Sequence, residues 1–140
     1  MRSGPTGNPE GLDGAVFQGT KQAIVADWPA CMQQFCLNCY NFDVFGGKLV
    51  SDDALRASWN ISVGSSPKGA LDCVNAWQIG LREDLKRIDV PALVIHGDAD
   101  RIALFPRSGK RTPELINGSG LVVIEGGPHS IAWTRSETVN

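Results

Sequence analysis

Two short apolar runs in the second half of the chain constrain the fold more than any other feature. Residues 90–96 read Val-Pro-Ala-Leu-Val-Ile-His, and residues 121–124 read Leu-Val-Val-Ile. Runs of branched apolar residues, bounded by charged or glycine-containing segments, are typical of buried parallel strands. About 25 residues separate the two runs, with a helix-compatible piece at 110–116, which is long enough for a crossover connection. The sequence therefore predicts two neighbouring parallel strands.

The first half of the chain has a different pattern, typical of helices. Apolar residues recur at three- and four-residue steps through residues 13–80, which predicts amphipathic helices. Four residues suited to a helix cap or a first turn mark their starts: Asp13, Pro29, Ser51 and Ser66. We therefore expect an α/β chain with a helical region at 1–85 and a strand-containing region at 86–140.

Composition and charge exclude several classes of function. The 140 residues are 42% hydrophobic and carry a formal net charge of -2, which gives no reason to expect nucleic acid or an anionic membrane as a partner. No stretch approaches the ~18 consecutive apolar residues of a membrane span, and residues 1–10 lack the apolar core of a signal peptide. The expected location is the cytoplasm.

The four cysteines, Cys31, Cys36, Cys39 and Cys73, raise the question of metal or redox chemistry. A structural zinc site needs about four ligands, usually in two pairs, and here Cys36 and Cys39 have no second pair to join them. A redox pair of this spacing opens a helix after a strand, whereas these two lie inside a segment with helical periodicity. We expect four reduced structural thiols and no metal, with a reversible Cys36–Cys39 disulfide as the alternative to test.

Each apolar run is followed by a polar loop that contains candidate catalytic residues. The loops read His-Gly-Asp-Ala-Asp-Arg at 96–101 and Glu-Gly-Gly-Pro-His-Ser at 125–130. Loops at the carboxyl ends of neighbouring parallel strands converge on one crevice, so a carboxylate and an imidazole can meet there. A carboxylate bonded to one ring nitrogen leaves the other nitrogen to accept a proton. His129 is the predicted base, and Asp100 or Asp98 is the predicted acid.

Residues 90–100 and 121–129 resemble the acid and histidine segments of the α/β-hydrolase superfamily, and more narrowly of its cofactor-free haloperoxidase and arylesterase branch. His129 follows Asp100 by 29 positions, as in that branch, which favours Asp100 over Asp98 as the acid. The resemblance continues through shorter segments in both halves, at 8–17, 57–60, 66–67, 108–111 and 133–134.

What this resemblance implies is a partial α/β-hydrolase fold. Residues 1–85 would be a helical cap region, and residues 86–140 the C-terminal part of the core, whose last parallel strands carry the acid and histidine loops. The family's serine nucleophile, on a Gly-x-Ser-x-Gly elbow, belongs upstream of Met1. No serine replaces it, since Gly-Ser-Ser-Pro-Lys at 64–68 ends in lysine. We therefore expect a fragment that is truncated at both ends and inactive alone.

The same resemblance implies a serine hydrolase that needs no cofactor. An upstream serine would attack a small ester or carboxylic acid substrate, His129 would relay its proton, and Asp100 would orient His129. Members of the branch can also pass the acyl group to hydrogen peroxide. The resulting peracid oxidises halide, which is the activity called non-haem chloroperoxidase. A homo-oligomer is left open.

Other residues have both structural and functional interpretations. Trp28 and Trp59, from the expected cap, are candidates for lining a substrate pocket, although aromatic residues at helical spacing are more often core. His96 is expected to be a structural hydrogen-bonding residue, and Arg101 to be exposed. The competing hypothesis for the whole chain is a non-catalytic truncated product or a helical interaction module that binds another chain through apolar surface.

Overall fold

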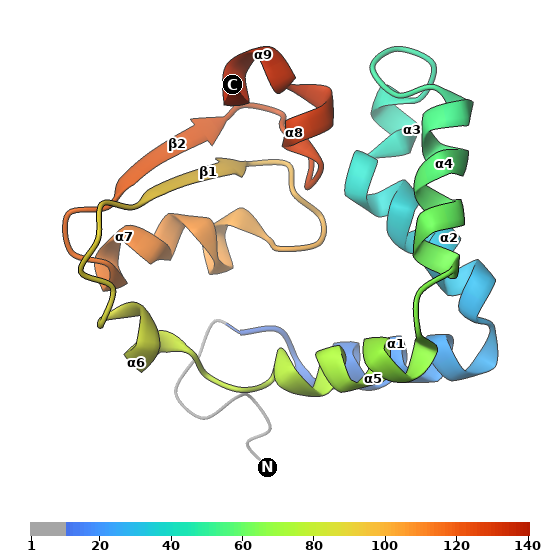
Figure 1. The fold of residues 1–140 in the computed structure, drawn as a ribbon, viewed down its shortest axis with the longest axis horizontal. Helices are drawn as coiled ribbons and strands as arrows, with labels where there is room; N and C mark the ends of the chain where they lie inside the picture. Colours follow the sequence, from blue (N-terminus) through green and yellow to red (C-terminus); the bar gives the residue numbers. More distant parts are fainter. Residues whose placement is uncertain (1–10) are drawn as a thin grey trace.

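A computed structural model describes residues 11–140 of the chain. The structure does not describe residues 1–10. The expectation that they lack a signal-peptide core, and the first part of the resemblance at 8–17, therefore concern residues outside the described part. Six helices of the described part precede the first strand (Figure 1). They are α1 (Gly14–Ala26), α2 (Trp28–Tyr40), α3 (Phe42–Phe45), α4 (Asp52–Val63), α5 (Pro67–Ala76) and α6 (Arg82–Leu85).

The four longer helices begin where the sequence predicts helix starts. The side chains of Asp13, Asp27, Ser51 and Ser66 accept hydrogen bonds from first-turn N–H groups of α1, α2, α4 and α5. Each bond satisfies a donor that the helix itself leaves unpaired. The predicted starts are confirmed, with Asp27 capping the helix whose first turn contains Pro29. The short helices α3 and α6 have no side-chain cap, which explains why the sequence gives no signal for them.

The longer helices pack in two pairs, α2 with α4 and α1 with α5. Two tryptophans tie the first pair together. The indole N–H of Trp28 donates to the carbonyl of Val63, and that of Trp59 donates to the carbonyl of Pro29, both at 2.9 Å. Each tryptophan thus connects one helix to an end of the other, which fixes where the two helices lie along each other.

The predicted pair of parallel strands is confirmed. Leu93 of β1 (Leu93–Gly97) lies opposite Gly120 of β2 (Gly120–Ile124), and Gly97 lies opposite Ile124. The crossover between them lies on one side of the sheet (Figure 1). It consists of three short helices: η1 (Phe105–Arg107), η2 (Gly109–Arg111) and α7 (Thr112–Leu115).

Two element boundaries differ from the prediction. The first strand begins at Leu93 rather than at residue 90, because Pro91 has no N–H to donate and the pairing starts where the Gly120 N–H donates to the Ala92 carbonyl at 2.9 Å. The helix predicted at 110–116 is divided into η2 and α7, and Pro113 falls in the first turn of α7. The crossover therefore consists of short helical turns and not of one continuous helix.

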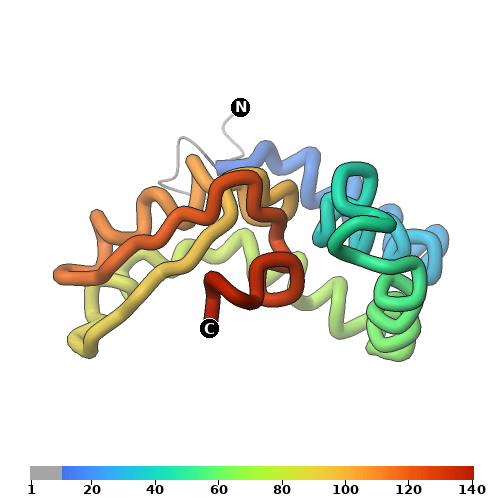
Figure 2. The backbone as a smooth tube through the Cα atoms, turned by 90° about the horizontal axis from the view of Figure 1, so that it is seen from above, coloured from blue at the N-terminus to red at the C-terminus, as the bar shows by residue number. Residues whose placement is uncertain are grey.

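Beyond β2, the chain forms two four-residue helices, α8 (Ile131–Thr134) and α9 (Ser136–Val139). Arg135 separates the two helices, because its backbone leaves the helical region at φ -137 and ψ 35. Seen from above, α8 and α9 lie between the sheet and the α2–α4 pair (Figure 2). The last turns of the chain thus bridge its two regions.

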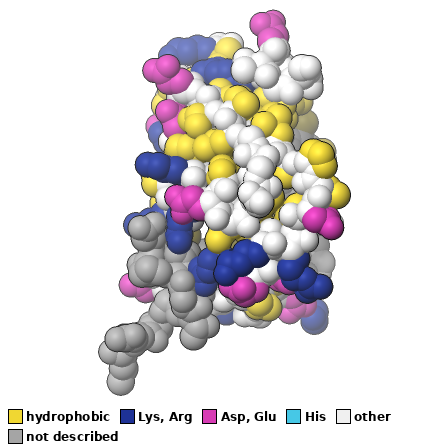
Figure 3. Space-filling model, turned by 90° about the vertical axis from the view of Figure 1, so that its left-hand side faces the viewer, with side chains coloured by type: hydrophobic (Ala, Val, Ile, Leu, Met, Phe, Trp, Pro, Cys, Tyr) yellow, Lys and Arg dark blue, Asp and Glu magenta, His cyan; other side chains and the backbone are white. Residues whose placement is uncertain are grey.

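The sheet keeps a large apolar surface exposed. Leu93 is 61% exposed and Val123 is 45% exposed, although both belong to paired strands. Figure 3, which shows the side of the molecule at the sheet end, has apolar side chains gathered over the middle of that face. The described residues cover these side chains only in part. In residues 11–140, no helix combines the length and the apolar character needed to cross a bilayer.

Candidate active site

The loops after β1 and β2 approach each other more closely than side chains would allow. A Cβ atom on Gly97 would lie 2.1 Å from the carbonyl oxygen of Gly127, so this crossing requires glycine. The Asp98 N–H donates to the Ile124 carbonyl at 3.2 Å, and the Ala99 N–H donates to the Gly127 carbonyl at 3.1 Å. These bonds extend the parallel pairing beyond the strands and bring the two predicted loops together.

Asp100 is a buried carboxylate with donors on both oxygens. Its side chain is 4% exposed. Oδ1 accepts hydrogen bonds from the N–H groups of Ile102 at 2.8 Å and Ala103 at 2.9 Å, and Oδ2 lies 2.8 Å from His129 Nδ1. Two backbone amides on one oxygen fix the plane of the carboxylate. The other oxygen is therefore directed at the imidazole.

His129 follows a rigid turn and reaches Asp100 from the second loop. Gly126 has a positive φ of 63, and Pro128 is fully buried. Because an ionised carboxylate can only accept, Nδ1 of His129 carries the ring proton, and Nε2 keeps its lone pair. The His129 side chain is 40% exposed, and no residue in the described part hydrogen-bonds to Nε2. A neutral His129 can therefore accept a proton from a group that approaches its open side.

His96 contacts the same carboxylate in a different role. Its Nε2 lies 2.8 Å from the Ala103 carbonyl oxygen and 3.2 Å from Asp100 Oδ2. Since a carbonyl oxygen only accepts, Nε2 carries the proton of a neutral His96. The ring centroid lies 5.5 Å from that of Phe105, and a Cβ on Gly109 would come within 2.4 Å of His96 Nδ1. His96 thus lies in a tight site beneath the acid loop, consistent with the structural role that the sequence suggests.

Asp98 and Arg101, which flank Asp100 in the sequence, make their hydrogen bonds to residues other than His129. Asp98 Oδ1 accepts a hydrogen bond of 2.7 Å from the N–H of Gly126, which connects the loop after β1 to the turn that precedes His129. Arg101 is exposed, and it also makes two hydrogen bonds to Asp43 of α3, at 2.7 and 3.2 Å. These bonds hold the pKa of the Asp43 carboxyl below its ordinary value and raise the pKa of Arg101. Sequence reasoning missed this link, since nothing in the local pattern pairs residues so far apart.

Trp28 and Trp59 are not joined to the acid–base pair. Within residues 11–140, neither has a hydrogen bond or a ring contact with Asp100 or His129. Both indole N–H groups are used between α2 and α4. Trp59 lines a pocket of about 220 Å³ between these helices, together with Leu55. The part of both tryptophans in substrate binding stays a prediction.

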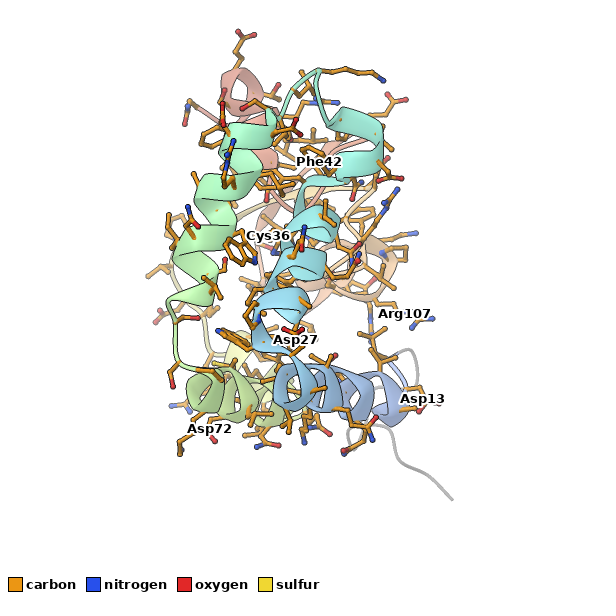
Figure 4. All side chains as sticks on the ribbon, turned by 90° about the vertical axis from the view of Figure 1, so that its right-hand side faces the viewer. Asp13, Asp27, Cys36, Phe42, Asp72 and Arg107 are labelled. Atoms are coloured by element: carbon orange, nitrogen blue, oxygen red, sulfur yellow. The ribbon has the colours of Figure 1, made fainter. Side chains whose placement is uncertain are left out.

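All four cysteines are free thiols. Cys36 lies on the side of α2 that faces α4 (Figure 4), with its Sγ 3.6 Å from Ser62 Oγ. Burial, assisted by the nearby Cys36 and Asp100, raises the pKa of the Cys39 thiol to about 12. Cys39 is therefore protonated and unreactive at neutral pH. Among the described residues, no three His, Cys, Asp or Glu side chains gather as they would around a metal ion.

Sequence relatives of the chain are haloperoxidases and esterases, although no family model matches it. A Synechocystis sp. protein, named as a candidate non-heme chloroperoxidase, is 50% identical over 133 residues, which are 95% of this chain and 48% of that protein. The bifunctional esterase/perhydrolase of Acinetobacter calcoaceticus is 31% identical over 139 residues, 95% of this chain and 49% of that protein. The chain thus spans about half the length of the curated relatives it matches.

Solved structures give the same result for the fold. A bromoperoxidase from Bacillus anthracis superposes with a TM-score of 0.86 at 36% identity, over 94% of this chain and 48% of that one. An esterase from Exiguobacterium antarcticum superposes with a TM-score of 0.82 at 23% identity, over 94% of this chain and 47% of that one, a likeness that concerns the fold alone. The chain therefore has a partial α/β-hydrolase fold, and its relatives are named as non-haem haloperoxidases and esterases.

Proposed function

We propose that this chain supplies the acid and the base of a serine hydrolase that cleaves small carboxylic esters. The proposal rests on the 2.8 Å contact between Asp100 Oδ2 and His129 Nδ1, in which the acid is buried and the base is open to solvent. A buried acid keeps the imidazole in one tautomer, and an open Nε2 gives a nucleophile access. An esterase among the relatives supports ester chemistry. In this proposal, residues 1–85 form the cap and residues 86–140 belong to the core.

The proposed reaction moves one proton through His129 in each half. As a serine oxygen attacks the ester carbonyl carbon, its hydroxyl proton passes to Nε2 of His129, and Asp100 stabilises the imidazolium. The bond to the alcohol oxygen then breaks, and that oxygen takes the proton from Nε2. A water molecule repeats the sequence on the acyl-enzyme and releases the carboxylic acid. We assign the serine and the oxyanion donors to the part of the relatives that this chain does not match.

Hydrogen peroxide is the proposed alternative to water in the second half of the reaction. If a peroxide oxygen attacks the acyl-enzyme, the products are a peracid and the free serine, and the peracid oxidises halide in solution. Relatives named as a perhydrolase and as non-heme chloroperoxidases support this step. His129 and Asp100 would act as they do in hydrolysis, so the proposal needs no cofactor.

The test adds the part of a relative that this chain does not match. The 140 residues are joined to the unmatched part of the Synechocystis relative, placed ahead of residue 1, and hydrolysis of p-nitrophenyl acetate is measured. We expect turnover that His129→Ala and Asp100→Asn both remove. The matched control Asp98→Asn should stay within about twofold of the parent, because an asparagine keeps the Oδ1 that accepts the hydrogen bond from the Gly126 N–H. A fusion that folds, and whose turnover survives His129→Ala, would contradict the proposal.

The isolated chain provides a second test. We expect no ester turnover from it, because triad residues act as a unit and lose covalent catalysis when the nucleophile is absent. Activity of the pure 140-residue chain that disappears in His129→Ala would mean that the nucleophile lies within it.

A non-catalytic interaction module is the second candidate, and the exposed apolar side chains favour it. Leu93, Val90 and Trp77 are each more than half exposed. Apolar surface of this kind is often covered by another chain. Two results together would identify a module. The pure chain would self-associate in sedimentation experiments, and the fusion would fold without hydrolysing esters.

A further inference from the structure

The turn between α2 and α3 lies against the loop that carries the acid. Asn41, the residue between the two helices, has left-handed backbone angles of φ 46 and ψ 52 and is only 3% exposed. Its side-chain Nδ2 donates a hydrogen bond of 2.9 Å to the carbonyl oxygen of Ala99, 58 positions away in the sequence. Ala99 immediately precedes Asp100, so this bond holds the peptide unit that leads into the acid.

The same turn also holds the loop that carries the base. The carbonyl of Cys39, near the end of α2, accepts a hydrogen bond of 3.0 Å from the N–H of Ser130, which immediately follows His129. Tyr40 packs edge-on against the ring of Trp133 in α8, with centroids 6.5 Å apart. One turn of the helical region therefore bonds to a backbone group beside each member of the acid–base pair.

The residue type at position 41 indicates that the hydrogen bond from Asn41 to the Ala99 carbonyl has a role beyond shaping the turn. A left-handed backbone favours glycine, and asparagine is among the few other residues that tolerate it. Glycine would adopt this turn without burying a polar group, whereas Asn41 leaves its Oδ1 buried and without a partner among the described residues. An unpaired buried acceptor is unfavourable. What asparagine adds over glycine here is the Nδ2 donor to the acid loop.

We propose that Asn41 is a positioning residue for the Asp100–His129 pair. Asn41 and the Cys39 carbonyl tie the acid loop and the base loop to one rigid turn, so that the 2.8 Å contact between Asp100 Oδ2 and His129 Nδ1 is maintained. The importance of this positioning for catalysis rests on the function proposed above. The geometric effect does not, because the contact can be observed without turnover.

The experiment measures the tautomer of His129 in the 140-residue chain by ¹⁵N NMR of labelled histidine. In the parent, the neutral ring is expected to carry its proton on Nδ1, facing Asp100. Asn41→Gly removes the Nδ2 donor and keeps the left-handed turn available. We expect the ratio of Nδ1–H to Nε2–H tautomer to fall severalfold. Asn60→Ala, an exposed change on α4, is the matched control and should leave the ratio unchanged.

Loss of folding is separated from loss of positioning by the indole N–H signals of Trp28 and Trp59, whose hydrogen bonds report on the α2–α4 pair. If Asn41→Gly disturbs these signals, Asn41→Asp serves instead, since it keeps the side-chain shape but replaces the donor with an acceptor. An unchanged His129 tautomer in the variant that keeps the indole signals overturns the proposal. A parent chain with no preference for Nδ1–H also overturns it.

The ester-hydrolysing fusion gives a second readout. There Asn41→Gly is expected to lower kcat about 10- to 100-fold with KM little changed, because a misplacement of about 1 Å near the chemistry has an effect of this size. A KM increase at constant kcat would contradict a positioning role. If the fusion is inactive while the tautomer responds to Asn41→Gly, the proposed function fails and the positioning role stands.

Discussion

Replacing Asp100 by asparagine tests the acid–base geometry with almost no change of shape. In the parent, Oδ1 accepts from two backbone amides, and Oδ2 faces the nitrogens His129 Nδ1 and His96 Nε2. An asparagine can keep Oδ1 on the amides, which places its NH₂ group against both rings. His129 must then accept at Nδ1 and carry its proton on Nε2, the nitrogen that a base needs free.

The size of the effect follows from the contacts that are lost. Hydrogen bonds to a charged group contribute about 1.5–3 kcal/mol each, and the bond from His129 is the shorter of the two ring contacts. His96 cannot reverse its tautomer without losing the Ala103 carbonyl, so its Nε2–H would face an N–H donor. We expect Asp100→Asn to lower the free energy of unfolding by about 2–4 kcal/mol. In the fusion enzyme, kcat should fall by about 10⁴-fold.

Two measurements on the same samples check this prediction. Urea denaturation followed by tryptophan fluorescence gives the free energy of unfolding, and ¹⁵N NMR gives the tautomer of His129. Asp98→Asn is the matched control, because it makes the same chemical change two residues earlier, where the carboxylate is exposed and accepts one backbone hydrogen bond. We expect the control to lose no more than about 1 kcal/mol and to leave the tautomer unchanged.

The reasoning would be refuted by an Asp100→Asn chain that keeps the Nδ1–H tautomer of His129. It would also be refuted by a stability loss no larger than that of Asp98→Asn. Either result would mean that the short contact between Asp100 and His129 does not control the proton position on the ring.

Four further predictions concern folding and reactivity. Gly97→Ala should destabilise the chain by about 3 kcal/mol or more in urea denaturation, because its Cβ would collide with a backbone carbonyl that cannot move aside. Exposed Cys73 should react rapidly with iodoacetamide at pH 8 while Cys39 stays protected, as mass spectrometry of the labelled peptides would reveal. Since burial raises the Cys39 pKa from 9.0 to about 12, its contribution to stability should be complete below pH 9 and lost as the pH rises from 9 to 12; a flat urea midpoint over that range would contradict this. Ser51→Ala should cost about 1 kcal/mol in the same assay through loss of the α4 cap, and Ser51→Thr should recover most of it.

The contact between Asp100 and His129 could be predicted because the positions of the two residues depend on local signals. Two apolar runs predict two parallel strands, and loops after parallel strands meet at one edge. Spacing and resemblance then favoured Asp100 over Asp98, and in the structure Asp100 contacts His129 while Asp98 holds a turn. Helix starts were equally predictable, since a cap residue acts on the N–H groups of the next few residues.

The contacts of the α2–α3 turn could not be predicted in this way. Asn41 and Asp43 reach Ala99 and Arg101 across 58 positions, and no periodicity or local motif relates residues at that separation. An asparagine at the end of a helix predicts only a left-handed C-terminal turn. That this turn would then dock on the acid loop depends on how the helical region packs, which is a property of the whole fold.

The register of the two strands sets the distance between Asp100 and His129. Asp100 and His129 are carried on short extensions of β1 and β2, so the separation of acid and base is inherited from which residues face each other across the sheet. A slip of one residue moves a strand by about 3.3 Å, several times the range over which a hydrogen bond keeps its strength. The two ends of the sheet differ in how strictly they hold this register. A Cβ at Gly120 would meet only the flexible end of the exposed Leu93 side chain, at 2.9 Å, whereas a Cβ at Gly97 would meet the backbone of Gly127, so the strict requirement lies at the end next to Asp100 and His129.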